Sequence, residues 1–419
     1  MEAQPSEIQF LVTRQPVFDQ RLAPWGTTLN FHQFDGNSPI FSDELTTSVL
    51  LEAYMPQRGQ TGQQTQVSFD TAALFDGLPR VIAPLGVQIE LEEAVGDTRD
   101  LPAAVAALKR DGYGIAVSGF QNRPSCRDLA RLADVIIVDM NSDTARLAAL
   151  VAEAKALGPK VQVRRLNDWQ NMLKARNSGA DLFQGFFFSR MNLPPSNKAV
   201  TASQLSRLRL LECMDKPDAD FKELTRLVEA DAALTYRLLV FINSAGFGLG
   251  RKVDSVQQAL MLAGWKALKA WLKIVLLTSM ASSPRHEEYC YYAAQRADFL
   301  QRAARAAGMD RNVAALSLLG LLSQLEALLE MPPAQALAGV PVADPIKIAL
   351  LGGESPYRAW LELVRSMENS RWDQAALIGK SAGLSMNDLA RCYHESFTET
   401  DTMFRNLPSN VRQAGKASN

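Results

Sequence analysis

The stretch Asp181-Leu182-Phe183-Gln184-Gly185-Phe186-Phe187-Phe188-Ser189 predicts a buried strand over residues 182–188 that carries one polar side chain, Gln184. Pro194 and Pro195 follow it, and because proline disrupts helices and central strands we expect regular structure to stop there. A lone amide in an apolar strand is either a hydrogen-bonded core group or part of a site. The residues of the preceding strands help to decide between a core group and a site, because a site would need further polar groups beside the amide.

Upstream of this stretch, short apolar strands alternate with helical segments. Val135-Ile136-Ile137-Val138 is wholly apolar, as expected of a parallel strand that is covered on both faces. The repeated strand–helix alternation predicts a parallel sheet, either open or closed into a barrel. The other expected strands cover residues 8–12, 28–31, 87–91, 114–117 and 161–163, and the expected helices cover residues 101–108, 128–132, 144–157 and 169–175.

Beyond residue 202 the sequence pattern is helical throughout. Residues 313–329 are almost continuously apolar and predict one helix at the centre of a bundle. Two polar segments are expected to be loops: residues 282–288, which contain His286, and the Gln- and Gly-rich residues 54–66.

The composition argues against several classes of function. The formal net charge is -1 over 419 residues, so no overall charge draws the chain to nucleic acid or anionic lipid. No apolar run reaches the roughly 18–20 residues that span a bilayer, and the first residues lack the features of a secretory signal. The four cysteines are scattered and only three histidines occur, which argues against disulfides, a zinc site and a histidine-rich hydrolase centre. We therefore expect a cytoplasmic protein with no nucleic-acid or membrane partner and no cofactor.

Two sets of motifs resemble known families. Ala230-Asp231-Ala232-Ala233-Leu234, Leu238-Leu239-Val240-Phe241-Ile242-Asn243-Ser244-Ala245 and Leu262-Ala263-Gly264-Trp265 resemble the HDOD domain, a relative of the HD phosphohydrolases. Arg14-Gln15-Pro16-Val17-Phe18-Asp19 and Gln184-Gly185-Phe186-Phe187-Phe188 resemble the EAL domain, the cyclic-di-GMP phosphodiesterase barrel. The whole chain is similar to the bacterial EAL–HDOD signalling proteins.

The EAL resemblance implies a site in which carboxylates and an amide hold two divalent cations, and a lysine assists attack of an activated water on a phosphodiester. Three of the corresponding positions keep the family's type of side chain: Glu90, Asp139 and Gln184. The other positions are substituted. They are Thr28 for a glutamate, His32 for a phosphate-binding arginine, Ser68 near a metal-binding asparagine, Ser118 and Gly119 for paired aspartates, Ile137 for the lysine, and Asn167 at or near the last glutamate.

Two carboxylates and one amide are too few to hold two metals, so we expect a degenerate barrel in which Glu90 and Gln184 are hydrogen-bonded near the mouth. HD hydrolases bind metals through His and His-Asp pairs, whereas residues 202–400 contain only His286 and His394, neither beside an aspartate. We therefore expect no catalytic residue and no metal ligand in either half. Two alternatives remain: a weak or residual cyclic-di-GMP phosphodiesterase, and a sensor that binds a cyclic dinucleotide without cleaving it.

The predicted organisation is a degenerate EAL-type α/β barrel over residues 1–192, a linker over 193–201, an HDOD helical domain over 202–408 and a flexible tail over 409–419. The resemblance implies a catalytically inactive signalling or scaffold protein in a pathway related to cyclic-di-GMP. Its expected partners are other signalling proteins, and an interface between its own two domains is a further candidate.

Overall fold

The structure, a computed structural model, has two compact units. It describes residues 9–35, 38–40, 63–98, 100–140, 143–190, 200–215, 269–278, 284–338, 340 and 342–405. One unit comprises Met1–Met191 with Ser366–Asp373, and the other comprises Asn192–Arg365 with Gln374–Asn419. The predicted linker lies mostly outside the described residues, and the exact domain bounds stay a prediction.

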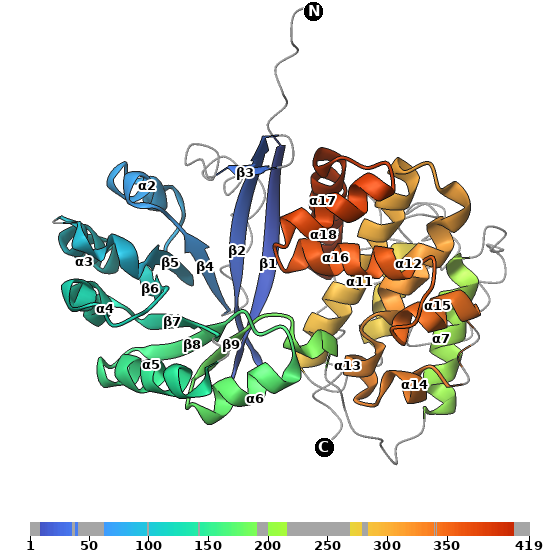
Figure 1. Ribbon diagram of the computed structural model, residues 1–419, viewed down its shortest axis with the longest axis horizontal. Helices are drawn as coiled ribbons and strands as arrows, with labels where there is room; N and C mark the ends of the chain where they lie inside the picture. Colours follow the sequence, from blue (N-terminus) through green and yellow to red (C-terminus); the bar gives the residue numbers. More distant parts are fainter. Residues whose placement is uncertain are drawn as a thin grey trace, which may run out of the picture. The chain divides into compact units, whose positions relative to one another are not determined.

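The first unit contains a closed barrel of eight strands (Figure 1). Around the barrel the order is β1-β9-β8-β7-β6-β5-β4-β2, and a pairing between β1 and β2 closes the ring. β1 is antiparallel to both neighbours, whereas all other neighbouring pairs in the ring are parallel. The strands are β1 Gln9–Asp19, β2 Pro24–Asp35, β4 Gln64–Ser68, β5 Val87–Glu92, β6 Gly114–Ser118, β7 Val135–Asp139, β8 Lys160–Arg164 and β9 Leu182–Gln184, and the short β3 Ser38–Ile40 pairs with β2 outside the ring.

Helices on the connections between strands cover the outside of this barrel (Figure 1). Three of them begin at aspartates whose side chains accept hydrogen bonds from backbone N–H groups of the first turn: Asp70, Asp143 and Asp168. The helices are α2 Thr71–Phe75, α3 Leu101–Arg110, α4 Arg127–Leu132, α5 Thr144–Ala156 and α6 Trp169–Asn177, with 3-10 turns at η2 Leu78–Val81, η3 Glu93–Asp97, η4 Pro124–Cys126 and η5 Phe187–Arg190.

The predicted last strand was too long, because β9 ends at Gln184 instead of continuing to residue 188. Gly185 has φ +135°, and a Cβ there would lie 2.4 Å from the carbonyl oxygen of Leu166. The chain can therefore turn against the backbone at this position only with a glycine. The following phenylalanines are buried against Phe18 instead of extending the strand.

The loop predicted over residues 54–66 was wrong at its end, because β4 begins at Gln64; residues 54–62 lie outside the described part of the chain. The strand was missed because Gln64 and Gln66 give it no apolar alternation. Gln66 is nevertheless fully buried, since its amide is hydrogen-bonded inside the barrel.

The second unit contains helices and no strand among its described residues. Its centre is the long α11, against which α12 and α18 pack, and α7 packs against α12. This agrees with the expected architecture of an α/β barrel followed by a helical region. The helices are α7 Ala202–Asp215, residues 269–278, α11 Pro284–Ala306, η7 Asp310–Asn312, α12 Val313–Leu322, α13 Leu325–Leu329, α14 Pro333–Ala336, α15 Asp344–Leu350, α16 Arg358–Glu368, α17 Trp372–Ser381 and α18 Met386–Arg405. The end of α16 and the start of α17 fall within Ser366–Asp373, which belongs to the first unit.

Two predictions for this unit were wrong. The expected helix 313–329 is divided at Ser323 and Gln324 into α12 and α13. Ser323 bonds to the carbonyl of Gly320 and to Arg296, which favours a break in the helix over continuation. His286 was predicted to lie in a loop, but it lies in α11 and is 1% exposed, because the polar residues around it belong to the first turns of that helix.

The HDOD-like motifs at 230–265 and the tail from residue 409 lie outside the described residues. None of the described helices is both long and apolar enough to cross a bilayer.

Candidate functional site in the barrel

An arginine that sequence reasoning did not single out lies at the centre of the candidate site. Arg164 is the last residue of β8, and it is paired in register with Asp139, the last residue of β7. Its Nη1 donates to Oε1 of Glu90 at 2.9 Å, and its Nε donates to Oδ1 of Asp139. Because β5 and β8 are not neighbours in the ring, the bond between Glu90 and Arg164 crosses the barrel interior. One guanidinium thus binds both carboxylates that the EAL resemblance retains.

The charges in this cluster are largely removed from water. The side chains of Glu90, Arg164 and Asp139 are 6%, 19% and 31% exposed. Burial raises the pKa of Glu90, while Arg164 and a hydrogen bond from Ser118 act in the opposite direction. Burial would lower the pKa of Arg164, but Glu90 and Asp139 together raise it above its usual value. Arg164 therefore stays cationic and supplies the positive charge that the two carboxylates require.

Below this cluster, a network of amides fills the barrel interior. Gln162 donates to Gln184 at 2.6 Å and exchanges hydrogen bonds with Gln66 at 2.9 and 3.1 Å. Gln66 also donates to Gln88 at 3.2 Å, and Gln184 donates to Gln15 at 3.0 Å. The side chains of this network come from β1, β4, β5, β8 and β9, so they join strands on opposite sides of the barrel.

Gln184 is thus both buried and satisfied: its oxygen accepts from Gln162 and its nitrogen donates to Gln15. Its environment is a dense set of hydrogen bonds among neutral groups, in which each amide orients the next. The amide at this position is held by other side chains from two directions.

Several predicted positions join these two groups. Thr28 donates to Gln66 at 2.8 Å and so belongs to the amide network. The hydroxyl of Ser118 donates to the backbone oxygen of Leu91 at 3.5 Å and acts to lower the pKa of Glu90. Ser68 is the last residue of β4, is paired in register with Glu90, and is exposed. Ile137 is fully buried in an apolar cluster with Val17, Ala116, Val135 and Leu182.

Three predicted positions lie apart from the cluster. Oγ1 of Thr13 lies 3.4 Å from Nε2 of His32 on the neighbouring strand. Gly119 follows β6 with φ +67°. Asn167 is exposed on the connection between β8 and α6. The structure therefore brings Glu90, Asp139, Ser118, Thr28 and Gln184 to the interior and leaves these three outside the ion-pair cluster.

Sequence reasoning missed Arg164 and the glutamines at 15, 66, 88 and 162. A signal for them exists in the strands, since polar residues two apart point to the same face. The pairs are Gln66 with Ser68, Gln88 with Glu90, and Gln162 with Arg164. Among the residues that the structure describes, no three His, Cys, Asp or Glu side chains gather as the ligands of one cation would.

The chain therefore combines an eight-stranded barrel, closed by an antiparallel first strand, with a helical region that contains an HDOD domain. Residues 204–331 match the HDOD domain family. The chain is 26% identical over 408 residues to "Uncharacterized protein YuxH" of Bacillus subtilis, covering 93% of this chain and 97% of that protein. It is 25% identical over 389 residues to "Cyclic di-GMP phosphodiesterase CdgJ" of Vibrio cholerae, covering 90% of this chain and 89% of that protein.

Solved structures of EAL domains are similar to the barrel half. The chain is 19% identical to the PaMucR phosphodiesterase in complex with c-di-GMP, with a TM-score of 0.37 and coverage of 43% of this chain and 90% of that one. It is 18% identical to the EAL domain of Mycobacterium smegmatis DcpA, with a TM-score of 0.36 and coverage of 42% and 90%. It is 22% identical to Klebsiella pneumoniae BlrP1, with a TM-score of 0.36 and coverage of 45% and 58%.

Proposed function

We propose that this protein is a bacterial signalling component related to the cyclic-di-GMP pathway, that its barrel does not cleave the dinucleotide, and that it acts by contact with other signalling proteins. The observation that carries the proposal is the binding of Glu90 and Asp139 by Arg164. The full-length similarity to CdgJ supports the pathway, and the ion pairs support the loss of hydrolysis.

The chemistry of divalent cations is the reason that this cluster argues against hydrolysis. Magnesium and calcium need several oxygen ligands, and a two-metal site needs them around both ions. Here the two carboxylates already neutralise a largely buried guanidinium, and a cation would have to displace Arg164 from both of them. The oxygen of Gln184 is already occupied by Gln162. The residues at this barrel mouth therefore do not fit a pair of divalent cations.

The second candidate is a weak phosphodiesterase. It is favoured by the similarity to a relative whose name states this activity. The two candidates differ in one measurable quantity, the rate at which the purified full chain hydrolyses cyclic-di-GMP with magnesium or manganese. We expect a rate no higher than that of buffer, with an active EAL phosphodiesterase as the positive control. Turnover that is lost in Glu90→Ala would overturn the proposal in favour of the enzyme.

A third possibility is a sensor that binds cyclic-di-GMP without cleaving it. Calorimetric titration with cyclic-di-GMP distinguishes such a sensor from the scaffold that we propose. Under our proposal no binding is expected in the micromolar range, because His32 replaces the phosphate-binding arginine that the family resemblance implies and imidazole cannot reproduce its bidentate contacts. Micromolar binding without turnover would replace the scaffold role by that of a sensor.

The role in protein contact needs a test in the native organism. A deletion strain should keep its cellular concentration of cyclic-di-GMP while a regulated behaviour, such as motility or biofilm formation, changes. The double variant Glu90→Gln with Arg164→Met, which removes both charges of the buried pair, should restore that behaviour as well as the natural chain does. If the protein acted only through catalysis, the deletion strain would instead show an altered concentration of cyclic-di-GMP.

A further inference from the structure

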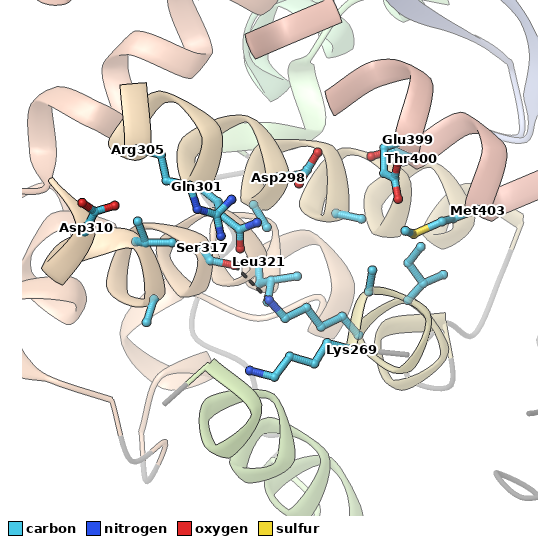
Figure 2. A pocket seen from close by; sticks show the side chains of 17 residues that line it. Lys269, Asp298, Gln301, Arg305, Asp310, Ser317, Leu321, Glu399, Thr400 and Met403 are labelled. Carbon is cyan, nitrogen blue, oxygen red and sulfur yellow. Dashed lines mark hydrogen bonds between the residues drawn. The ribbon is translucent and has the colours of Figure 1, made fainter. Parts of the chain in front are cut away.

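The helical unit contains a cavity of about 500 Å³ that the proposed function does not use (Figure 2). The helix at residues 269–278 forms one wall, and α11 and α12 form the others, with the end of α18. A cavity of this size is typical of sites for small organic molecules, which occupy roughly 300–1,000 Å³. The described residues that line it all belong to the second unit.

One end of the cavity is basic. Lys269 and Lys273 come from the 269–278 helix, and Arg305 comes from the last turns of α11. The ammonium of Lys273 donates to the buried hydroxyl of Ser317 at 3.0 Å, which fixes the direction of its long side chain. In Figure 2, Arg305, the amide of Gln301 and the carboxylate of Asp310 lie toward this same end, near Ser317. Three cations outweigh this one carboxylate, and with two neutral hydrogen-bonding groups they are a suitable environment for a phosphate, which carries more than one negative charge.

A second part of the lining is apolar. Small side chains of Ala270, Ala297 and Ala314, together with Ile274 and Leu321, line its walls. Alanines on facing helices leave space for a flat group, because none of them extends far from its backbone. A planar ring would bury apolar surface here without the loss of a hydrogen bond at its faces.

Two further carboxylates, those of Glu399 and Asp298, lie away from the end that holds Arg305 and Asp310. Glu399 lies with Thr400 toward the end opposite Arg305 in the view of Figure 2, and Asp298 lies between these ends. Asp298 is neutralised by Arg302, which it contacts at 2.6 Å on the same helix. Carboxylates accept hydrogen bonds from hydroxyl groups and from amino groups on rings, so they suit a ligand that is more than a simple anion.

We propose that this cavity binds a nucleoside phosphate, with the phosphate against Lys273, Lys269 and Arg305 and the base between the alanine-lined walls. The ligand class follows from the three kinds of lining side chain: cationic, small and apolar, and hydrogen-bond accepting. An inorganic anion would use only the first of these, and an apolar molecule only the second. The proposal is independent of whether the barrel cleaves cyclic-di-GMP.

Calorimetric titration of the full chain with GMP and AMP tests the proposal, with inorganic phosphate and guanosine as the two halves of the ligand. We expect at least one nucleotide to bind at least about tenfold more tightly than either half, since a single charged hydrogen bond contributes on that order. Arg305→Met should weaken binding by about tenfold or more. Ala314→Leu should weaken it by filling the apolar part of the cavity. Lys380→Met, an exposed lysine on α17 outside the cavity, is the matched control and should leave binding unchanged.

Arg305 is exposed, so its substitution is expected to leave the fold intact, and circular dichroism of each variant checks this. The proposal is overturned if neither nucleotide binds at millimolar concentration, if inorganic phosphate binds as tightly as the nucleotides, or if either Arg305→Met or Ala314→Leu leaves the affinity unchanged. Loss of binding in both variants with retention in Lys380→Met supports it.

Discussion

Arg164 is the residue on which the proposed loss of catalysis depends most. It lies between two carboxylates, one of them almost completely buried, and each partner makes the other's charge tolerable in the interior. A buried pair of this kind contributes little net stability over an apolar replacement, but the loss of one partner is costly. Substitution of a single member of this cluster should therefore change the stability of the barrel measurably.

We predict that Arg164→Met lowers the free energy of unfolding by about 3 kcal/mol, because Glu90 and Asp139 are left without their cation. The double variant Glu90→Gln with Arg164→Met should recover a large part of this loss, since a neutral amide can be buried at lower cost. Urea unfolding of the natural chain, both single variants and the double variant measures the coupling between the two residues. If the losses of unfolding free energy in the two single variants simply add in the double variant, a direct ion pair between Glu90 and Arg164 is contradicted.

The same variant has a predictable dependence on pH. Burial raises the pKa of Glu90, and removal of Arg164 should raise it further. An acid whose pKa is higher in the folded than in the unfolded state destabilises the fold when it is ionised, so stability increases as the pH falls through the folded-state pKa. Arg164→Met should thus recover stability relative to the natural chain as the pH is lowered from 8 toward 5. The double variant with Glu90→Gln should lack this recovery.

At the scale of single elements, α12 packs closely against α11 because Gly320 lies at the contact between them. A Cβ added to Gly320 would lie 2.5 Å from the backbone nitrogen of Ala297 and 2.6 Å from its Cα. Real Cβ atoms do not approach backbone so closely, so the two helices would have to move apart. The glycine therefore sets the distance between two central helices of the second unit.

We predict that Gly320→Ala lowers the free energy of unfolding by about 2 kcal/mol or more, since a rigid backbone and not a flexible side chain must give way. Gly308→Ala is the control: it follows α11 with φ +69° and has no atom within 4 Å of its added methyl, so it should cost only the roughly 1–2 kcal/mol of a left-handed alanine. Chemical denaturation compares the two. A smaller loss in Gly320→Ala than in Gly308→Ala would show that α12 can shift freely.

The elements also show which parts of the fold could be predicted from the sequence. β6, β7 and β8 were predicted because their apolar residues follow the pattern of covered parallel strands. β4 was not, because its buried residue Gln66 is polar and its partners, Gln88 and Gln162, lie on β5 and β8. The break between α12 and α13 depends on bonds of Ser323 to Arg296 on another helix, which no local pattern contains.

The same limit applies to the candidate site. Family resemblance located Glu90, Asp139 and Gln184, since each keeps its type of side chain. It did not identify Arg164, because an arginine at the end of a strand is ordinarily a solvated residue. The role of Arg164 depends on the strand register that pairs it with Asp139. It depends also on the closure of the barrel, which places Glu90 within hydrogen-bonding distance. Such contacts are properties of the folded chain and not of a segment.

At the scale of the whole molecule, two units with separate cores should unfold as separate events. The barrel core is formed by strands before residue 191 and the other core by helices after residue 192. We predict two transitions in scanning calorimetry. Arg164→Met should lower the temperature of one transition, and Gly320→Ala should lower that of the other. A single transition that moves with both substitutions would contradict this and indicate strong coupling between the units.

The antiparallel first strand has a consequence for how the protein is made. β1 pairs with β2 as soon as both have been synthesised, but its other neighbour, β9, contributes Gln184 opposite Val17. The ribosome must therefore complete the chain through this last strand before the ring can close, and until then β1 presents an open edge. Contacts between residues so distant in sequence form slowly, so the nascent barrel passes through a stage in which unpaired edges can associate with other chains. The helical half is translated during or after this stage, so the edge of β1 can still be open when the second unit begins to emerge from the ribosome.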